Sequence, residues 1–261
     1  MRALSIAATG MLAQQTNVEV IANNLANMNT TGFKTQRAEF QDLLYQNVER
    51  PGAATSDANT MLPSGIQIGV GVRTAATYRI TEQGNLNTTG NPYDLAVQGQ
   101  GMFHIQMPDG SDAYTRDGAF SLSAEGQIVT SKGYTVAPGI SIPAGAISVA
   151  INAQGQVQAT VAGQAAPQTL GQIELARFPN EGGLQATGDS LFTETAASGS
   201  ALAGVPGSPG YGTLSQGFLE TSNVNAVQEI TSLITAQRAY EMNSKVITAA
   251  DQMLDTTSKM S

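Results

Sequence analysis

The chain has no cysteine, and His104 is its single histidine among 261 residues. The lack of cysteine excludes thiol catalysis, disulfide bonds and cysteine-ligated zinc. The lack of a second histidine excludes multi-histidine metal sites, so a Ser-His-Asp relay could use His104 alone. Because His104 lies in a segment that alternates like a strand, we interpret it as a structural residue.

Charged residues are also scarce, at 12%, and they leave a formal net charge of −8. Globular domains usually carry about a quarter of charged residues. Lysine and arginine total 12 and are scattered, so the chain offers no basic face to phosphates, and we predict no nucleic-acid partner. Neutral polar side chains can pack against copies of themselves without repulsion, which favours self-association over a soluble enzyme.

Long apolar runs are missing as well. The sequence has no run of about 18 apolar residues, the length that a membrane-spanning helix needs, so we predict no membrane insertion. Near the N-terminus Gln14, Gln15 and Asn17 interrupt the apolar residues, and no small-residue cleavage site follows. We therefore expect no cleaved signal peptide.

The remaining candidates for chemistry are weak. Asp109, Asp112 and Asp117 form an acidic cluster, but Phe120 stands where a calcium loop needs its bidentate glutamate. The segment Gly99-Gln100-Gly101 lacks the third glycine and the helix of a dinucleotide site. We interpret both segments as turns and predict no enzyme activity, no metal and no cofactor.

What the sequence does contain is an apolar seven-residue repeat at each end, in residues 4–28 and 224–256. This spacing is typical of a coiled-coil seam. The predicted seam, which we expect to be a subunit interface, consists of Leu4, Met11, Val18, Ile21, Leu25, Met28, Ile230, Leu233, Tyr240, Ile247 and Leu254. Leu12, Val227 and Ile234 lie off this seam and give the helices a second apolar face, which needs partners outside the chain. We expect the ends to be mobile in an isolated copy and helical on assembly.

Between the two ends the sequence changes to short strands and glycine turns. Residues 65–72 alternate like a strand, and Asp-Gly pairs at 109–110 and 117–118 are typical of hairpins. The predicted fold class is α+β, with long terminal α-helices that pair as a coiled coil and an inserted, mainly antiparallel β domain. The predicted division is a helical domain of 1–30 and 223–261, a connecting region of 31–78, and a β-rich outer domain of 79–222.

Residues 45–64 form an extended stretch within the connecting region. Pro51 and Pro63 each lack a backbone donor, and few apolar residues offer a core face. One interpretation is a disordered surface loop. The other is an arm that becomes ordered only against a neighbouring copy.

Two stretches carry a resemblance to a known family. Residues 17–40 (NVEVIANNLANMNTTGFKTQRAEF) and 220–254 resemble the N- and C-terminal signatures of the flagellar rod and hook family. The matching signature residues are Asn23, Asn24, Asn27, Thr31, Gly32, Phe33, Lys34, Gln237, Arg238, Tyr240, Asn243 and Ser244. The middle segments LPSGIQIGVGVRTAAT and PDGSDAYTRDGAFSL are most similar to the distal-rod branch, so the resemblance covers nearly the whole chain.

The resemblance implies a structural subunit of the distal rod, the drive shaft that transmits torque from motor to hook. The terminal helices of many copies would form an inner tube around a channel, with the β domain outside and residues 45–64 bracing neighbours. The implied location is the basal body, in the rod that spans the periplasm.

The partners that the resemblance implies are further copies in a helical polymer, other rod proteins, the hook protein and the P- and L-ring bushing proteins. They also include the flagellar type III export apparatus, which would export the chain without a cleaved signal peptide. The alternatives are a proximal rod or hook protein of the same family, or, from another class, a β-rich carbohydrate-binding or hydrolytic domain.

Overall fold

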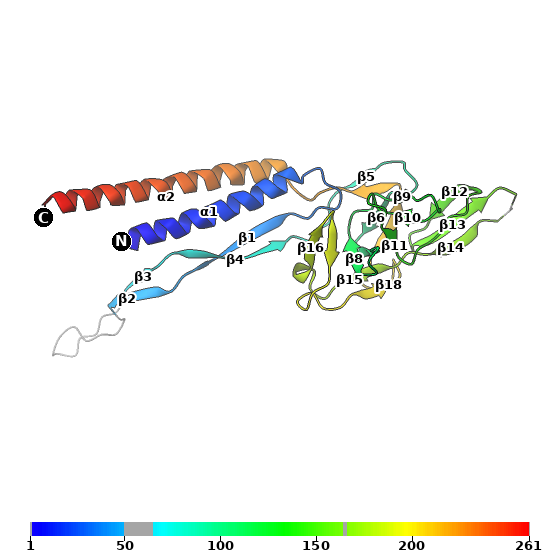
Figure 1. Ribbon diagram of the computed structural model, residues 1–261, viewed down its shortest axis with the longest axis horizontal. Coiled ribbons are helices and arrows are strands. Elements are labelled where there is room, and N and C mark those ends of the chain that lie inside the picture. Colours follow the sequence, from blue (N-terminus) through cyan, green and yellow to red (C-terminus); the bar gives the residue numbers. More distant parts are fainter. Residues whose placement is uncertain (1, 50–64, 164–165, 261) are drawn as a thin grey trace. The chain divides into compact units, whose positions relative to one another are not determined.

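The computed structural model describes residues 2–49, 65–163 and 166–260 and shows two helices at the chain ends with strands between them (Figure 1). This arrangement confirms the α+β class. The helices are α1 (Arg2–Ala26) and α2 (Ala226–Met260), and one 3-10 turn is η1 (Glu181–Gly183). The strands are β1 (Gln36–Asp42), β2 (Tyr45–Glu49), β3 (Ile66–Gly69), β4 (Val72–Arg79), β5 (Leu86–Thr88), β6 (Leu95–Gln98), β7 (Met102–Gln106), β8 (Asp112–Thr115), β9 (Ser121–Leu122), β10 (Ile128–Val129), β11 (Thr135–Val136), β12 (Ala146–Ile151), β13 (Gln156–Val161), β14 (Gln168–Gln172), β15 (Leu175–Arg177), β16 (Gln185–Gly188), β17 (Leu191–Thr193), β18 (Leu202–Gly204), β19 (Thr213–Gln216) and β20 (Phe218–Glu220).

The chain divides into two compact units. The helical unit comprises residues 1–26, 36–78 and 225–261, and the β unit comprises residues 27–35 and 79–224. The sequence predicted a separate connecting region, but its larger part groups with the helices and its beginning groups with the β unit. As a result the backbone passes between the two units at four points.

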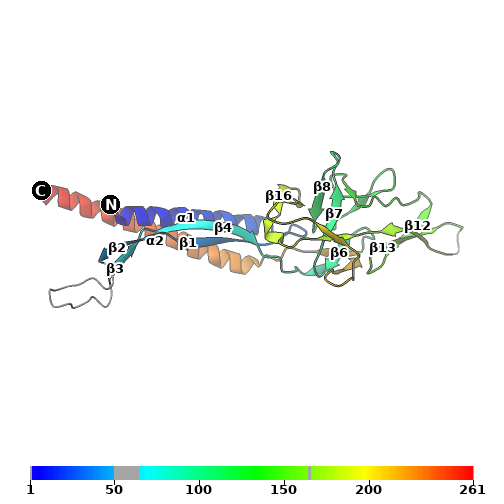
Figure 2. The ribbon, with the colours of Figure 1, turned by 90° about the horizontal axis from the view of Figure 1, so that it is seen from below.

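In the helical unit, α1 and α2 lie side by side and run in opposite directions (Figures 1 and 2). Asn225 caps α2, because its Oδ1 accepts hydrogen bonds from the backbone N–H groups of Val227 (3.1 Å) and Gln228 (3.3 Å). The helix ends lie within a few residues of the predicted ones. α1 ends at Ala26, just before a turn whose Asn and Gly residues tolerate the backbone conformations that end helices.

Two ribbons of paired strands complete the helical unit: β1 with β4, and β2 antiparallel to β3. The predicted extended loop therefore begins with a strand. The single strand predicted over 65–72 is split between Gly69 and Val72. Gly71 lies in this break with φ of +130°, and a Cβ there would lie 2.2 Å from the Thr9 hydroxyl on α1. Glycine thus permits both the break and the close approach to the helix.

The β unit is built on a sheet whose central path is β16-β17-β8-β7-β11-β10-β9, with β15 bonded to β7 and β18. A three-stranded sheet, β12-β13-β14, and the pairs β6–β19 and β5–β20 are hydrogen-bonded separately. Pairing is antiparallel throughout these sheets. β5 pairs with β20, the last strand before α2.

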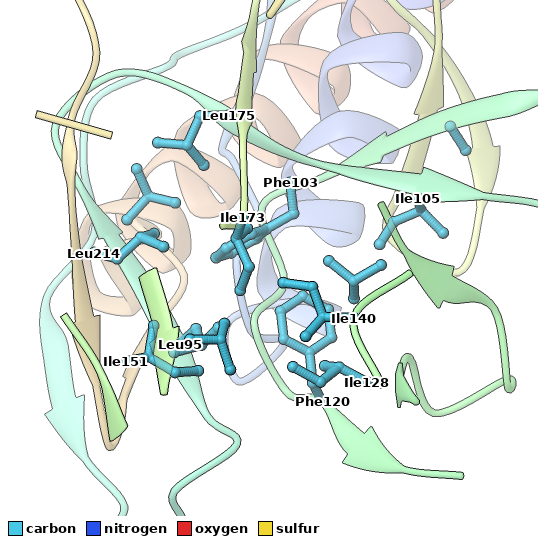
Figure 3. Packing of buried hydrophobic residues seen from close by; sticks show 14 of the residues in the cluster. Leu95, Phe103, Ile105, Phe120, Ile128, Ile140, Ile151, Ile173, Leu175 and Leu214 are labelled. Atoms are coloured by element: carbon cyan, nitrogen blue, oxygen red, sulfur yellow. The ribbon is translucent and has the colours of Figure 1, made fainter. Parts of the chain in front are cut away.

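The larger of two clusters of buried apolar side chains in the β unit lies in its interior (Figure 3). It includes Leu95, Val97, Phe103, Ile105, Phe120, Ile128, Ile140, Ile151, Ile173, Leu175 and Leu214. The Phe103 and Phe120 rings meet edge to face, with centroids 5.0 Å apart. Each fully buried side chain of this kind contributes about 1.5–3 kcal/mol. The β unit therefore has a core of its own that does not depend on the helices.

Candidate assembly surface

Small and apolar side chains dominate the covered part of the paired helices. Ala7, Ala13, Ile21, Ala236 and Ala250 are buried. The predicted seam residues that are partly buried are Leu4, Met11, Val18, Leu25, Leu233 and Ile247. A Cβ on Gly10 of α1 would lie 2.9 Å from the side-chain nitrogen of Asn243 on α2. The absence of a side chain at Gly10 therefore lets the two helices approach closely.

Four predicted seam residues remain exposed: Met28, Ile230, Tyr240 and Leu254. Met28 follows the end of α1, and Ile230 is next to Glu229, whose side chain accepts a hydrogen bond from Asn24 on α1. None of the four is covered in the single chain, so all four are available to other copies. The interface role that the sequence assigned to the seam stays a prediction.

Further apolar side chains accompany these residues along the outer side of the helices. The helix stripe, as we name it, comprises Leu12 on α1 and Val227, Ile230, Ile234, Tyr240, Met242, Val246, Met253, Leu254 and Met260 on α2. Its most exposed members include Val227 (75%) and Met260 (82%). Single exposed apolar residues are normal, but a continuous series marks an interaction surface.

No other part of the described chain covers the C-terminal end of α2. α2 has 35 residues and α1 has 25, and both views show α2 continuing beyond the N-terminal end of α1 (Figures 1 and 2). Ala250 is buried, whereas every residue of 251–260 is exposed. Isolated helical ends are marginally stable in water, so this segment is suited to packing on another chain.

The ribbon of β2 and β3 presents a second apolar surface. Its exposed side chains are Tyr45, Val48, Ile66 and Ile68, preceded by Leu44, which is 85% exposed. This ribbon is the base of the predicted arm, whose prolines Pro51 and Pro63 lie outside the described residues. An exposed apolar ribbon of this kind invites contact with another surface.

Asn24 fixes how the ribbons and helices of the helical unit fit together. Its side chain is almost fully buried, at 1% exposure. Oδ1 accepts a hydrogen bond from the Gln36 backbone N–H, and Nδ2 donates to the Gln36 carbonyl, both at 2.8 Å. Nδ2 also donates to Glu229 Oε2 at 3.4 Å. One amide thus joins α1, β1 and α2.

Replacing Asn24 with leucine is expected to destabilise the helical unit by about 1–3 kcal/mol, because the buried Gln36 backbone groups lose their partners. Hydrogen exchange of the α1 amides measures this loss. Gln15→Leu is the matched control, since Gln15 is an exposed α1 residue whose side chain donates a hydrogen bond to Glu19. This substitution should lower the stability of the helical unit by less than about 0.5 kcal/mol. If the two substitutions destabilise the helical unit equally, the Asn24 side chain does not hold α1, β1 and α2 together.

In the β unit, a buried ion cluster ties distant segments together. Glu220 is 1% exposed. Its Oε1 accepts hydrogen bonds from Lys34 Nζ (2.6 Å) and the Gly84 N–H (2.9 Å), and its Oε2 accepts from Arg116 Nε (2.5 Å). The Glu220 backbone carbonyl also accepts the Gly32 N–H at 2.8 Å. Both carboxylate oxygens therefore accept hydrogen bonds.

Asn223 extends this cluster to the neighbouring backbone. Its Oδ1 accepts hydrogen bonds from the N–H and the hydroxyl of Thr35, each at 2.7 Å. Its Nδ2 donates to the carbonyls of Ile80 and Glu82, each at 3.0 Å. We name Lys34, Thr35, Arg116, Glu220 and Asn223 the junction cluster, because the segments it joins contain every point at which the chain enters or leaves the β unit.

Hydrogen bonds and opposite charges offset the effect of burial on the charged groups of the junction cluster. Burial raises the pKa of Glu220, but the charge of Arg116 and the bonds from Lys34, Arg116 and Gly84 outweigh it, so the pKa lies below its ordinary value. Burial lowers the pKa of Lys34, with partial compensation by Glu220. The Arg116 guanidinium also donates to the carbonyls of Val97, Gly99 and Gly101.

Gly32 is a tightly packed backbone position beside the cluster. Its φ is +67°, and a Cβ there would lie 2.8 Å from the backbone of Arg116 and Asp117. Gly32→Ala is therefore expected to cost more than Gly110→Ala, since Gly110 has a similar φ of +82° but open space around it. We expect about 1 kcal/mol for Gly110→Ala and at least about 2 kcal/mol for Gly32→Ala. Urea unfolding of the two variants measures the difference, and equal losses would refute the close contact.

The family-signature residues occupy different environments. The segment that enters the junction cluster contains Thr31, Gly32, Phe33 and Lys34. The helix pair includes Asn24 and Asn243. Asn27 Oδ1 accepts the Thr30 hydroxyl at 3.1 Å. The exposed signature residues are Asn23, Gln237, Arg238, Tyr240 and Ser244.

Sequence reasoning missed Arg116, Glu220 and Asn223. The last two lie at the start of the C-terminal signature stretch, before its helix, and that position was the available signal. Burial of a charged residue cannot be read from composition or periodicity, because its partners come from distant segments.

The described part of the chain shows no feature that suggests catalysis. It contains no group of three or more His, Asp or Glu residues placed to hold a metal. His104 Nε2 and Asp112 Oδ1 lie 2.8 Å apart at the surface, and the His104 ring stacks on Tyr114, so this histidine is fixed by its neighbours. None of the described helices is long and apolar enough to cross a membrane.

Comparison with known families matches three successive parts of the chain. Residues 4–34 match the model described as "Flagella basal body rod protein". Residues 96–159 match "Flagellar hook protein FlgE/F/G D1 domain", and residues 215–260 match "Flagellar basal body rod FlgEFG protein C-terminal". The matches include both helices and the junction segments that adjoin them.

Three relatives that match over their full length carry the same name. The chain is 60% identical to the flagellar basal-body rod protein FlgG of Caulobacter vibrioides over 100% of this chain and 99% of the relative. It is 55% identical to that of Agrobacterium fabrum, over 99% of both chains. It is 39% identical to that of Bacillus subtilis, over 97% of both chains.

Proposed function

Because the chain belongs to the family of the flagellar basal-body rod protein FlgG, we propose that it is a structural subunit of the flagellar distal rod. The observation that supports this role most directly is the helix stripe, whose apolar side chains recur along α2 and are exposed within a single chain. Burial of this stripe against further copies provides the driving force for a polymer. No catalytic step is part of the proposed function.

The terminal helices form the inner tube in this proposal. A heterologous contact, in which different surfaces of identical copies meet, leaves a free site after every addition and produces an open helical polymer. The uncovered 251–260 end of α2 would pack along the helices of the next copy, and the exposed members of the seam would face neighbours sideways. The β2–β3 ribbon and the arm that it begins would brace adjacent copies and keep the tube straight.

The junction cluster gives the subunit the stiffness that torque transmission requires. A drive shaft must carry force between its inner and outer layers through the backbone links of each subunit. Lys34, Arg116 and Glu220 hold these links inside the β unit with charge-assisted hydrogen bonds, which are about twice as strong as neutral ones. Asn223 adds four hydrogen bonds between neutral groups. We assign the helical tube to 1–30 and 223–261, the connecting and bracing region to 31–78, and the outer layer to 79–222.

The remaining parts of the proposal concern location and partners. The rod of the basal body spans the periplasm, and its subunits would contact other rod proteins, the hook protein and the P- and L-ring bushing. Export through the flagellar type III apparatus, without cleavage of a signal peptide, would bring the chain to the growing rod. The proximal rod and the hook are the alternative locations within the family.

Electron microscopy of the purified full-length chain at increasing concentration tests this function. We expect straight hollow filaments above a critical concentration and monomers below it. A chain that remains monomeric at every concentration, and whose gene does not restore swimming to a strain that lacks its own rod subunit, would refute the proposal. A saccharide-dependent shift in size-exclusion chromatography would favour the carbohydrate-binding alternative.

A further inference from the structure

One long part of the β unit carries no charge. Residues 133–173 contain no Asp, Glu, Lys, Arg or His, although the whole chain has 20 acidic and 12 basic residues. This stretch forms the β12-β13-β14 sheet, whose strands lie together as one projection of the β unit (Figure 1). We name the described residues of 143–172 the neutral lobe.

The neutral lobe has one face in the core and one face outside. Val157 and Ala159 are fully buried, and Ile151 is nearly so. By contrast Ile147 is 72% exposed. The exposed residues around it are small or neutral: Ala144, Gly145, Ser148, Ala150, Ala162, Gly163, Ala166, Pro167, Gln168 and Thr169.

Such a surface is unusual for a protein region that stays in water. Soluble surfaces normally carry about 25–35% charged residues, with few exposed isoleucines. The neutral lobe has no charged residues, and it exposes Ile147 on its outer strand β12. These features indicate that another surface covers the lobe in the functional state.

The edges of the lobe limit how that surface can bind. A bulge between Ala146 and Ser148 interrupts β12 at Ile147. Farther along the same strand the Gln216 side chain accepts the Ile151 N–H (3.0 Å) and donates to the Val149 carbonyl (3.0 Å). Bulges and satisfied backbone groups oppose the addition of a further strand. Contact through exposed side chains is therefore favoured.

We propose that the neutral lobe is a contact surface for a second copy of this chain in the outer layer of the polymer. The inference rests on the proposed rod function. Identical subunits with a net charge of −8 repel one another wherever their acidic residues meet, and a charge-free lobe avoids this repulsion. A basic or acidic partner would instead require opposite charges on the lobe.

Photo-cross-linking in assembled rods tests this contact. Benzoylphenylalanine introduced at Ile147 is expected to give a product of two cross-linked copies in the polymer and none in dilute monomer. In parallel, both Ile147→Lys and Ile147→Glu should raise the critical concentration for polymerisation at least about 10-fold, because either charge is buried at the contact. Leu122→Lys is the control, since Leu122 is 40% exposed on β9 outside the lobe, and it should leave the critical concentration unchanged.

The outcomes separate the lobe contact from the rod function. Normal polymerisation of both Ile147 variants, or a cross-link to a different protein, would overturn the lobe contact and leave the rod function intact. Absence of polymers from the unmodified chain would remove the rod function itself. Because Ile147 is exposed in the single chain, the circular dichroism of each variant monomer should match that of the unmodified chain.

Discussion

Glu220→Gln is expected to lower the free energy of unfolding of the β unit by about 3–5 kcal/mol, the usual cost of breaking a buried ion pair from one side. The substitution keeps the shape of the side chain but removes its charge. Lys34 and Arg116 would then remain buried without a counter-charge. The β unit should lose the order of the four segments that the junction cluster joins, while its apolar core remains intact.

Hydrogen exchange of the β7 amides measures the decrease in the free energy of unfolding, because β7 is a central strand of the main sheet. Lys132→Met is the matched control. Lys132 and Asp189 form a 3.5 Å pair on the surface of the same unit, and exposed pairs contribute about 0–1 kcal/mol. A loss for Glu220→Gln no larger than that for Lys132→Met would show that the cluster has no special role in stability.

The pH dependence of stability provides a second measure of the contribution that Glu220 makes to the β unit. The folded-state pKa of Glu220 lies below its ordinary value of 4.5. Its contribution to stability is therefore present above about pH 4.5 and is lost as the pH falls through the lower folded-state pKa. The unmodified β unit should lose stability over this acid range more steeply than the Glu220→Gln variant, which has no carboxylate at this position.

Ile234→Asp is expected to abolish polymerisation and swimming while leaving the single chain folded. Ile234 is 47% exposed on α2, so a carboxylate there remains in water in the monomer. In the polymer the same carboxylate would be buried against another copy without a partner, at a cost of several kcal/mol per contact. Each subunit repeats this cost, so the critical concentration should rise at least about 100-fold.

The control for Ile234→Asp is Leu202→Asp. Leu202 is 54% exposed on β18 of the β unit, outside both the helix stripe and the neutral lobe. Sedimentation and motility assays should separate the two variants clearly. If they impair polymerisation equally, the effect reflects added charge in general and gives no support to the helix stripe.

The terminal helices were predictable because their determinant is local. Seven-residue spacing of Leu4, Met11 and Val18 predicts a helix wherever the segment lies. The Asp-Gly turns and apolar alternation likewise predict antiparallel strands. These features were sufficient for the fold class and for most of the element positions.

The parts that sequence reasoning missed depend on distant partners. β2 was not predicted, because its residues show no clear alternation and it forms only by pairing with β3 across the arm. The hydrogen bond that Asn24 donates to Glu229 joins the two ends of the chain, and seven-residue spacing carries no signal for it. Arg116 and Glu220 lie far apart in sequence and can be recognised as a pair only when the fold brings them together.

Hydrogen exchange of α2 in the dilute monomer and in assembled filaments tests the central claim, that copies cover the apolar helices of one another. The amides of residues 226–260 should exchange far more slowly in the filament, and the 251–260 end should show the largest gain in protection. Equal exchange rates in monomer and filament would show that neighbouring copies leave these helices uncovered and would contradict the claim.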